Sequence, residues 1–345
     1  MLRQARNELT IEVRIEGKSP LLIKDGRESK NKGEKDLPSA VFQSRLERED
    51  IEAAVRGKRL DPMLSGLVVP GSSIRGAVRS HLEKALRSLD EEPKVCDPFI
   101  GVGSEDDDHE RESVEEQRPD ASCSSRLSNK EASAPVHAYR DSCPICQLFG
   151  NTAQGSRIAF GEGRFTGGKP ALIDNNAISR QTGAAISPFK SLVVLNAVVI
   201  AELQIRNFEL WQAGLLARLF DDLKNGFVRL GSGKSKGWGR ITAKATSMTL
   251  TYFGLDNRLG EGKLLGVAEM IPGGTAEAYG MTQCAKPPEL PAFTQDAAAS
   301  FWRQTATIHK PEELWDQCRP FFDKATWASV KTLAARRAAA GTERA

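Results

Sequence analysis

The hydrophobic and polar residues of this chain follow two different periods. Alternation with a period of two predicts strands, and apolar residues three and four positions apart predict helices. In chain order the predicted elements are strands at 8–24, a short helix within 41–57, a strand ending at Pro70, a helix from Ser72 or Ser73 to about residue 89, a strand at 156–165, a hairpin with a long strand within 171–205, a helix at 211–226 and a strand at 240–253. This order is that of an α+β, ferredoxin-like or RNA-recognition-type core with insertions.

Two further regions interrupt or follow this core. Residues from about 97 to 142 form a long, largely acidic insertion. Residues 257–345 hold a predicted helix at 311–336 and end in a basic, alanine-rich stretch. We therefore expect one domain over residues 1–256 and a C-terminal helical extension over 257–345.

Composition supports a packed protein with a basic body. The chain has 345 residues, of which 40% are hydrophobic and 27% charged, with a net charge of +3. Residues 104–120 are strongly acidic, so the remainder is more basic than the net charge suggests. A basic body favours a polyanion such as nucleic acid. No apolar run reaches the roughly 18 residues of a membrane span, and no signal-peptide core is visible, so we expect a cytoplasmic protein without a membrane partner.

Two segments combine backbone freedom with positive charge. In "LGSGKSKGWGR" (230–240), glycines permit positive φ while lysines and an arginine offer charge to phosphates. The loop follows a helix and precedes a strand, unlike a nucleotide-binding P-loop. A solvated glycine turn is the alternative, and for Trp238 core packing is favoured over base stacking.

The segment "VPGSSIRGAVR" (69–79) places a tight turn between a strand and a basic helix, which is a favourable anion site. Ser72, Ser73 and Arg75 would contact phosphates there, and Arg79 follows one turn later. The alternative is an ordinary helix cap with a solvated arginine.

The six cysteines include one C-x-x-C pair, Cys143 and Cys146. A tetrahedral zinc ion needs two more ligands. Cys96 is the predicted third and His137 the predicted fourth, with Cys123 or His109 as alternatives. A structural zinc ion would hold together the ends of the acidic insertion, whereas buried thiols without metal are the other interpretation.

Four motifs, in order, resemble those of the RAMP superfamily, the RNA-handling proteins of CRISPR systems. They are "VPGSSIRGAVRSHLE", "CPICQLFGNTAQGSRIAF", "NNAISRQTGAA" and "GSGKSKGWGR", within residues 8–256. The set is most similar to the repeated backbone subunit of type III effector complexes. That resemblance implies binding to a guide RNA and a complementary target RNA, and assembly with further copies and other effector subunits.

The resemblance also implies residue roles. A thumb hairpin at about 171–195 would carry Arg180 and Thr182 and flip out one nucleotide at intervals. Guide contacts would come from the two basic segments, namely Ser72, Ser73, Arg75, Arg79, Gly231, Gly233, Lys234, Ser235 and Lys236.

Relatives that cut target RNA carry an aspartate before x-Pro, and Asp36 occupies that place here. Asp25 and Asp61 are lesser candidates, and residues 41–60 form an insertion on this alignment. Cleavage at six-nucleotide intervals would use a divalent cation such as magnesium. The alternatives are a catalytically silent structural subunit or a precursor-RNA endonuclease, for which His81 is the available histidine near the first core helix.

Overall fold

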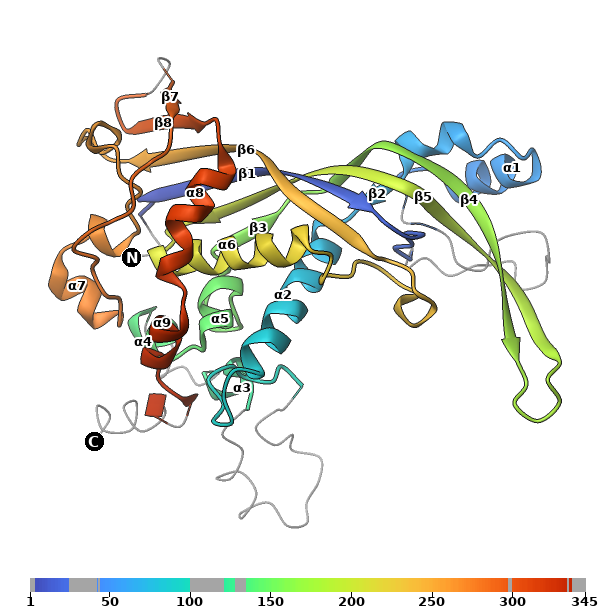
Figure 1. The fold of residues 1–345 in the computed structure, drawn as a ribbon, viewed down its shortest axis with the longest axis horizontal. Helices are drawn as coiled ribbons and strands as arrows, with labels where there is room; N and C mark the ends of the chain where they lie inside the picture. Colours follow the sequence, from blue (N-terminus) through green and yellow to red (C-terminus); the bar gives the residue numbers. More distant parts are fainter. Residues whose placement is uncertain are drawn as a thin grey trace, which may run out of the picture.

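A computed structural model describes residues 4–24, 42, 44–99, 121–127, 135–296, 300–333 and 335–336. Its centre is one sheet in the order β2-β4-β5-β1-β6-β8-β7, with β3 also paired to β5 (Figure 1). The strands are β1 (Asn7–Gly17), β2 (Val68–Val69), β3 (Ile158–Phe160), β4 (Gly163–Ile178), β5 (Ala185–Arg206), β6 (Ile241–Phe253), β7 (Phe293–Gln295) and β8 (Arg303–Ile308). The α-helices are α1 (Arg48–Arg56), α2 (Gly71–Arg87), α3 (Cys123–Arg126), α4 (Pro135–Arg140), α5 (Pro144–Phe149), α6 (Leu210–Lys224), α7 (Gly273–Ala278), α8 (Pro311–Cys318) and α9 (Lys324–Ser329).

The core has the predicted ferredoxin-like arrangement. Strands β4, β5, β1 and β6 are neighbours and run antiparallel, and both α2 and α6 lie on one face of the sheet (Figure 1). Alternate residues of β1 are buried beneath these helices because its apolar positions repeat every second residue. Helix α6 begins with a capping box between Glu209 and Gln212, which stabilises its amino end. The α+β prediction is confirmed.

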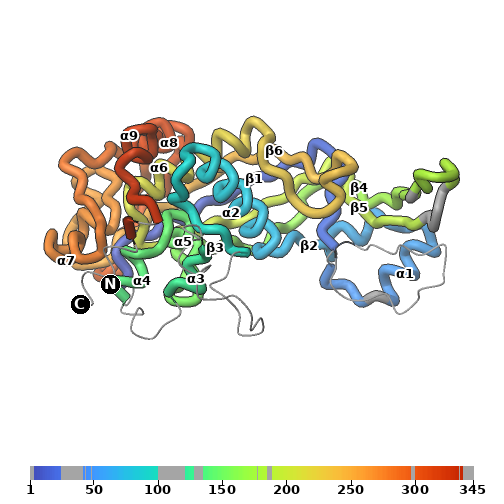
Figure 2. Tube along the Cα trace, turned by 90° about the horizontal axis from the view of Figure 1, so that it is seen from below, coloured from blue at the N-terminus to red at the C-terminus, as the bar shows by residue number. Residues whose placement is uncertain are grey.

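A long hairpin extends from this core. Strands β4 and β5 pair from Arg164 opposite Ile200 to Ile178 opposite Ala185, and their far halves project away from the body (Figures 1 and 2). Helix α1 and the 3-10 helix η1 (Asp61–Gly66) pack against the hairpin through a small apolar cluster. The inserted segment therefore supports one side of the hairpin.

The C-terminal region differs from the helical extension that the sequence predicted, because it also contains two strands. Strand β8 pairs with β6, and β7 pairs with β8, so the region extends the core sheet. The predicted helix at 311–336 is broken into α8, the 3-10 helix η7 (Arg319–Phe321) and α9. The ring of Trp315 on α8 stacks on Phe220 of α6 at 5.0 Å, and Arg319 forms an ion pair with Asp221. The extension is thus packed onto the core.

The described part of the chain contains no helix that is both long and apolar enough to span a membrane.

Candidate nucleic-acid interface and metal centre

The glycine loop at 230–240 needs its glycines for close backbone contact. Gly231 has a φ of 83°, and a Cβ there would lie 2.3 Å from the carbonyl oxygen of Leu22. The amide of Ser232 donates to that same oxygen at 2.7 Å, and the amide of Gly239 donates to the carbonyl of Pro20 at 2.9 Å. The loop is therefore fixed against the segment that follows β1, and only a residue without a side chain fits at Gly231.

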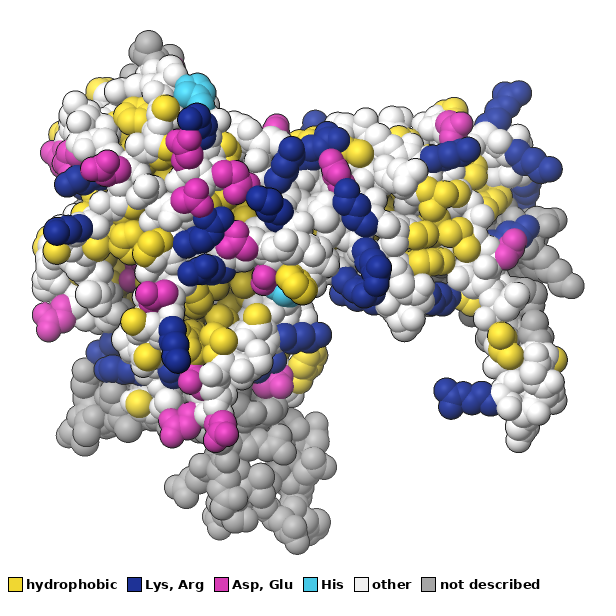
Figure 3. Space-filling view, viewed as in Figure 1, with side chains coloured by type: hydrophobic (Ala, Val, Ile, Leu, Met, Phe, Trp, Pro, Cys, Tyr) yellow, Lys and Arg dark blue, Asp and Glu magenta, His cyan; other side chains and the backbone are white. Residues whose placement is uncertain are grey.

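The outer part of this loop is basic and touches the hairpin. Lys234, Ser235 and Lys236 are exposed. The Nζ of Lys236 donates to Oδ1 of Asn175 at 2.9 Å and lies 4.8 Å from the ring of Phe189, so it contacts both hairpin strands. Trp238 is buried, as core packing predicts. Basic side chains gather along β6 and over this loop, beside the recess between body and hairpin (Figure 3).

The hairpin tip presents the two predicted side chains to solvent. Arg180 and Thr182 are both exposed. The tip is closed locally, because the amides of Gln181 and Thr182 donate to Oγ of Ser179 and the amide of Gly183 donates to its carbonyl. Ile178, 67% exposed, lies directly before the tip. The tip therefore offers both a cation and apolar surface.

The turn before α2 is close-packed. A Cβ on Gly71 would lie 2.0 Å from the carbonyl oxygen of Phe160, so glycine is required at the first position of the helix. Ser72 is exposed and Ser73 is half-buried. Ile74 of this turn and Leu230 of the glycine loop line the same apolar cavity between the helices and the sheet. The two basic segments thus lie on the same face of the sheet.

Arg75 and Arg79 are directed differently from the prediction that they contact phosphate. Arg75 donates to the carbonyl of Phe149 on α5. The Nε of Arg79 donates to Glu83 at 2.8 Å, and its Nη2 reaches the sulfur of Cys146 at 3.6 Å. Both guanidinium groups lie within about 6 Å of the Phe149 ring. These arginines hold α2 to α5.

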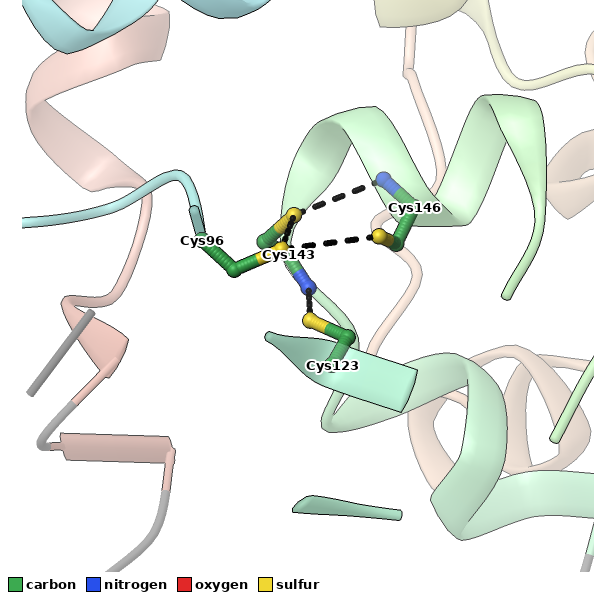
Figure 4. A group of neighbouring side chains, drawn as sticks. All are labelled: Cys96, Cys123, Cys143 and Cys146. Atoms are coloured by element: carbon green, nitrogen blue, oxygen red, sulfur yellow. Dashed lines mark hydrogen bonds between the residues drawn. The ribbon is translucent and has the colours of Figure 1, made fainter. Parts of the chain in front are cut away.

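Four buried cysteines meet beside these arginines. The sulfur atoms of Cys96, Cys123, Cys143 and Cys146 all lie within 4.8 Å of one another (Figure 4). The Cys96 sulfur is 3.6 Å from that of Cys143 and 3.7 Å from that of Cys146. Zn–S bonds of about 2.3 Å in a tetrahedron place sulfurs about 3.8 Å apart. The four residues could therefore bind a metal such as zinc.

The structure brings together three of the four predicted ligands, and the alternative Cys123 lies where His137 was expected. His137 lies on α4, where its Nδ1 is hydrogen-bonded to Arg140 at 2.9 Å, and it does not belong to the sulfur cluster. Cys123, the first residue of α3, supplies the fourth sulfur. His109, the other alternative, lies outside the described residues.

The cluster is surrounded by positive charge. Arg126 donates to the Cys123 sulfur at 3.1 Å, and the half-buried Arg336 donates to the carbonyl of Ser142 at 2.9 Å. Hydrogen bonds from Cys143 and Cys146 hold the pKa of Cys123 well below its ordinary value, whereas burial raises the pKa of Cys143. A metal ion would replace these competing protons. Arg126 was not among the residues predicted from the sequence, although its position three residues after Cys123 could have indicated it.

Of the residues considered for catalysis, the structure describes only Asp61 and His81. Asp36 and Asp25 lie outside the described residues. Asp61 is exposed at the start of η1. His81, the histidine considered for a processing enzyme, pairs with Asp222 of α6 at 2.7 Å and links the two core helices.

Comparison with known proteins places the chain in a family. No curated protein matches it. The model of the RAMP superfamily matches residues 14–242, which is more than half of the chain and includes the turn before α2, the four cysteines, the hairpin and the glycine loop. The chain therefore belongs to the RAMP superfamily, which indicates a CRISPR-associated RNA-binding protein.

Proposed function

We propose that this protein is a guide-RNA-binding backbone subunit of a type III CRISPR interference complex. The observation that carries the proposal is the contact of Lys236 with both Asn175 and Phe189, because it ties the basic glycine loop to the far half of the projecting hairpin, near its tip. A ribose-phosphate strand lying along the loop would meet the hairpin at once. Residues 1–256 form the RNA-binding domain in this proposal, and 257–345 form the extension.

The loop and the turn before α2 would hold the guide backbone without reading its bases. Exposed Lys234 and Lys236 supply charge to phosphates, while Ser72 and Ser73 offer hydroxyl groups at the amino end of α2. Arg180 and Thr182 at the hairpin tip would contact the duplex between guide and target RNA. Further copies of the chain would follow along the same guide, with other effector subunits as neighbours, in the cytoplasm.

Zinc is the metal we propose for the four-cysteine centre. Four thiolates with one Zn²⁺ carry a net negative charge, and Arg79, Arg126 and Arg336 surround the cluster with positive charge. The ion would join the two ends of the acidic insertion to α5. Its role would be structural, because all four coordination positions are filled by protein.

The binding role is tested with the full-length chain and guide RNAs of increasing length. Mass photometry is expected to show more copies on longer guides, and a single copy at every length would refute a backbone subunit. The variant Lys234→Met/Lys236→Met is expected to bind single-stranded RNA at least about 10-fold more weakly at low salt. The matched variant Lys84→Met/Lys324→Met removes the same charge from exposed positions elsewhere and is expected to bind like the parent.

Target cleavage is a separate part of the proposal and rests on Asp36 with a divalent cation such as magnesium. The guide-loaded complex is incubated with labelled complementary RNA and Mg²⁺, and cuts are expected at six-nucleotide spacing. Asp36→Ala is expected to slow cutting by about 100-fold or more, while Asp61→Ala tests the lesser candidate and is expected to cut like the parent. Equal cutting by Asp36→Ala would refute that assignment, and an assembly that never cuts would favour the silent structural subunit.

A further inference from the structure

We infer that Arg79 is an outer-sphere partner of the metal centre, and that through it and Arg75 the metal positions the RNA-binding turn before α2. Metal binding and RNA binding are then linked. This inference rests on the proposed function, because it takes the four cysteines as a zinc site and the turn as a contact for RNA.

Arg79 is held between an acid and a metal-site sulfur. Its Nε donates to Glu83 at 2.8 Å, and its Nη2 lies 3.6 Å from the sulfur of Cys146. The Glu83 side chain is 9% exposed and the Arg79 side chain 22%. A guanidinium that is fixed in this way on a ligand sulfur lowers the energy of a thiolate and orients it, which is what outer-sphere groups of metal sites do.

One turn earlier on α2, Arg75 makes a second contact with the metal-bearing segment. It donates to the carbonyl of Phe149, the last residue of α5, which begins directly after Cys143 and contains Cys146. The guanidinium carbon atoms of Arg75 and Arg79 lie 5.6 and 6.0 Å from the centre of the Phe149 ring. The second and third turns of α2 are therefore attached to α5 by these two arginines.

The contact continues to the turn itself. The ring of Phe149 stacks on that of Phe160, with centroids 6.5 Å apart and planes inclined by 13°. The carbonyl of Phe160 is the atom that a side chain on Gly71 would strike, at 2.0 Å. Every residue of α5 is buried. A shift of α5 would consequently move Phe149, Phe160 and the amino end of α2 together.

The metal would control this arrangement through the position of α5. A zinc ion held by the four cysteines would tie α5, which contains Cys146, to the segments that carry Cys96 and Cys123. Without the ion, α5 and the two arginine contacts that attach it to α2 would be held less firmly. The state with a fixed turn is then less favoured. By thermodynamic linkage, RNA bound at the turn strengthens zinc binding by the same factor.

The zinc side of the inference is measured by competition with a chromophoric chelator. Arg79→Met is expected to weaken zinc binding by about 10-fold, which is the lower end of the range of effects found when outer-sphere groups of metal sites are removed. Arg79→Lys retains a charge and is expected to lie between this variant and the parent. Lys84→Met, an exposed change on the same helix, should bind zinc like the parent. Cobalt spectra of each variant confirm that four sulfur ligands remain. Parent-like zinc affinity in Arg79→Met would refute the inference.

The RNA side uses fluorescence anisotropy with a labelled single-stranded RNA. Removal of zinc from the parent is expected to weaken RNA binding several-fold while far-ultraviolet circular dichroism shows that the core stays folded. At saturating zinc, Arg79→Met should keep the parent's salt dependence, because Arg79 does not contact phosphate; a direct phosphate contact would lower the slope by about one. RNA affinity that is independent of zinc, or a reduced slope, would refute the linkage. If the zinc-loaded parent ignores RNA, the proposed function fails instead, and the chelator titration still decides the role of Arg79.

Discussion

The glycine loop and the amino end of α2 were both predicted to bind phosphate, yet the structure directs their charges in opposite ways. In the loop, whose backbone is fixed against Leu22, Lys234 is exposed and Lys236 is exposed but reaches the hairpin at Asn175. On α2, Arg75 and Arg79 turn back onto α5 and the Cys146 sulfur. Sequence shows where positive charge is placed, and only the fold shows what it faces. In our proposal the loop is a surface for RNA, whereas the arginines of α2 connect that helix to the four-cysteine cluster.

The largest expected difference concerns the metal centre behind α2. Cys123→Ala should abolish the spectrum of a cobalt ion held by four sulfurs, and it should destabilise the protein by about 3 kcal/mol or more, because loss of a structural metal is among the most damaging single changes. His137→Ala should leave the spectrum unchanged, since His137 bonds to Arg140. Cobalt titration and chemical denaturation measure both effects. An unchanged cobalt spectrum in Cys123→Ala would show that another residue is the fourth metal ligand.

A smaller difference is expected between two glycines of α2. Gly71→Ala forces a Cβ to within 2.0 Å of the Phe160 carbonyl and should cost about 1–3 kcal/mol of the free energy of unfolding. A Cβ on Gly76 meets nothing within 4 Å. Gly76→Ala should therefore raise stability by about 0.5–1 kcal/mol, because alanine is the better helix former. Equal effects of the two substitutions in urea denaturation would mean that the turn is not close-packed against β3.

The sequence predicted the regular parts of the fold and missed the parts fixed by distant contacts. Helix α6 and the β4–β5 hairpin follow from strong periodicity. Strand β7 has only three residues, and β8 is mostly polar and gains its stability from pairing with β6. Such strands are defined by their neighbours rather than by their own pattern. The region was therefore predicted as helical only.

The candidate site residues also fall into two groups, those that a local sequence pattern predicts and those that only distant contacts define. Glycine spacing identified the loop, because positive φ and close approach are demands of the local backbone. The fourth cysteine follows no short spacing rule, since Cys123 lies 20 residues from Cys143 and only the folded chain shows that the two are in contact. The inward direction of Arg79 had one local signal, namely Glu83 four residues later, which is a favourable helical ion pair.

The smallest expected effects compare the loop and α2 directly through single charges. Lys234→Met should weaken RNA binding by a few-fold to about 10-fold and reduce the salt slope by about one, with no change in stability, because the side chain is exposed. Arg75→Met should do the reverse: stability falls by about 1 kcal/mol through the lost bond to the Phe149 carbonyl, and the salt slope stays at the parent value. Fluorescence anisotropy over a series of salt concentrations gives the salt slope of each variant, and urea denaturation gives the free energy of unfolding of each. If Arg75→Met lowers the slope as Lys234→Met does, then Arg75 leaves Phe149 for phosphate when RNA binds, and both segments form one continuous basic surface.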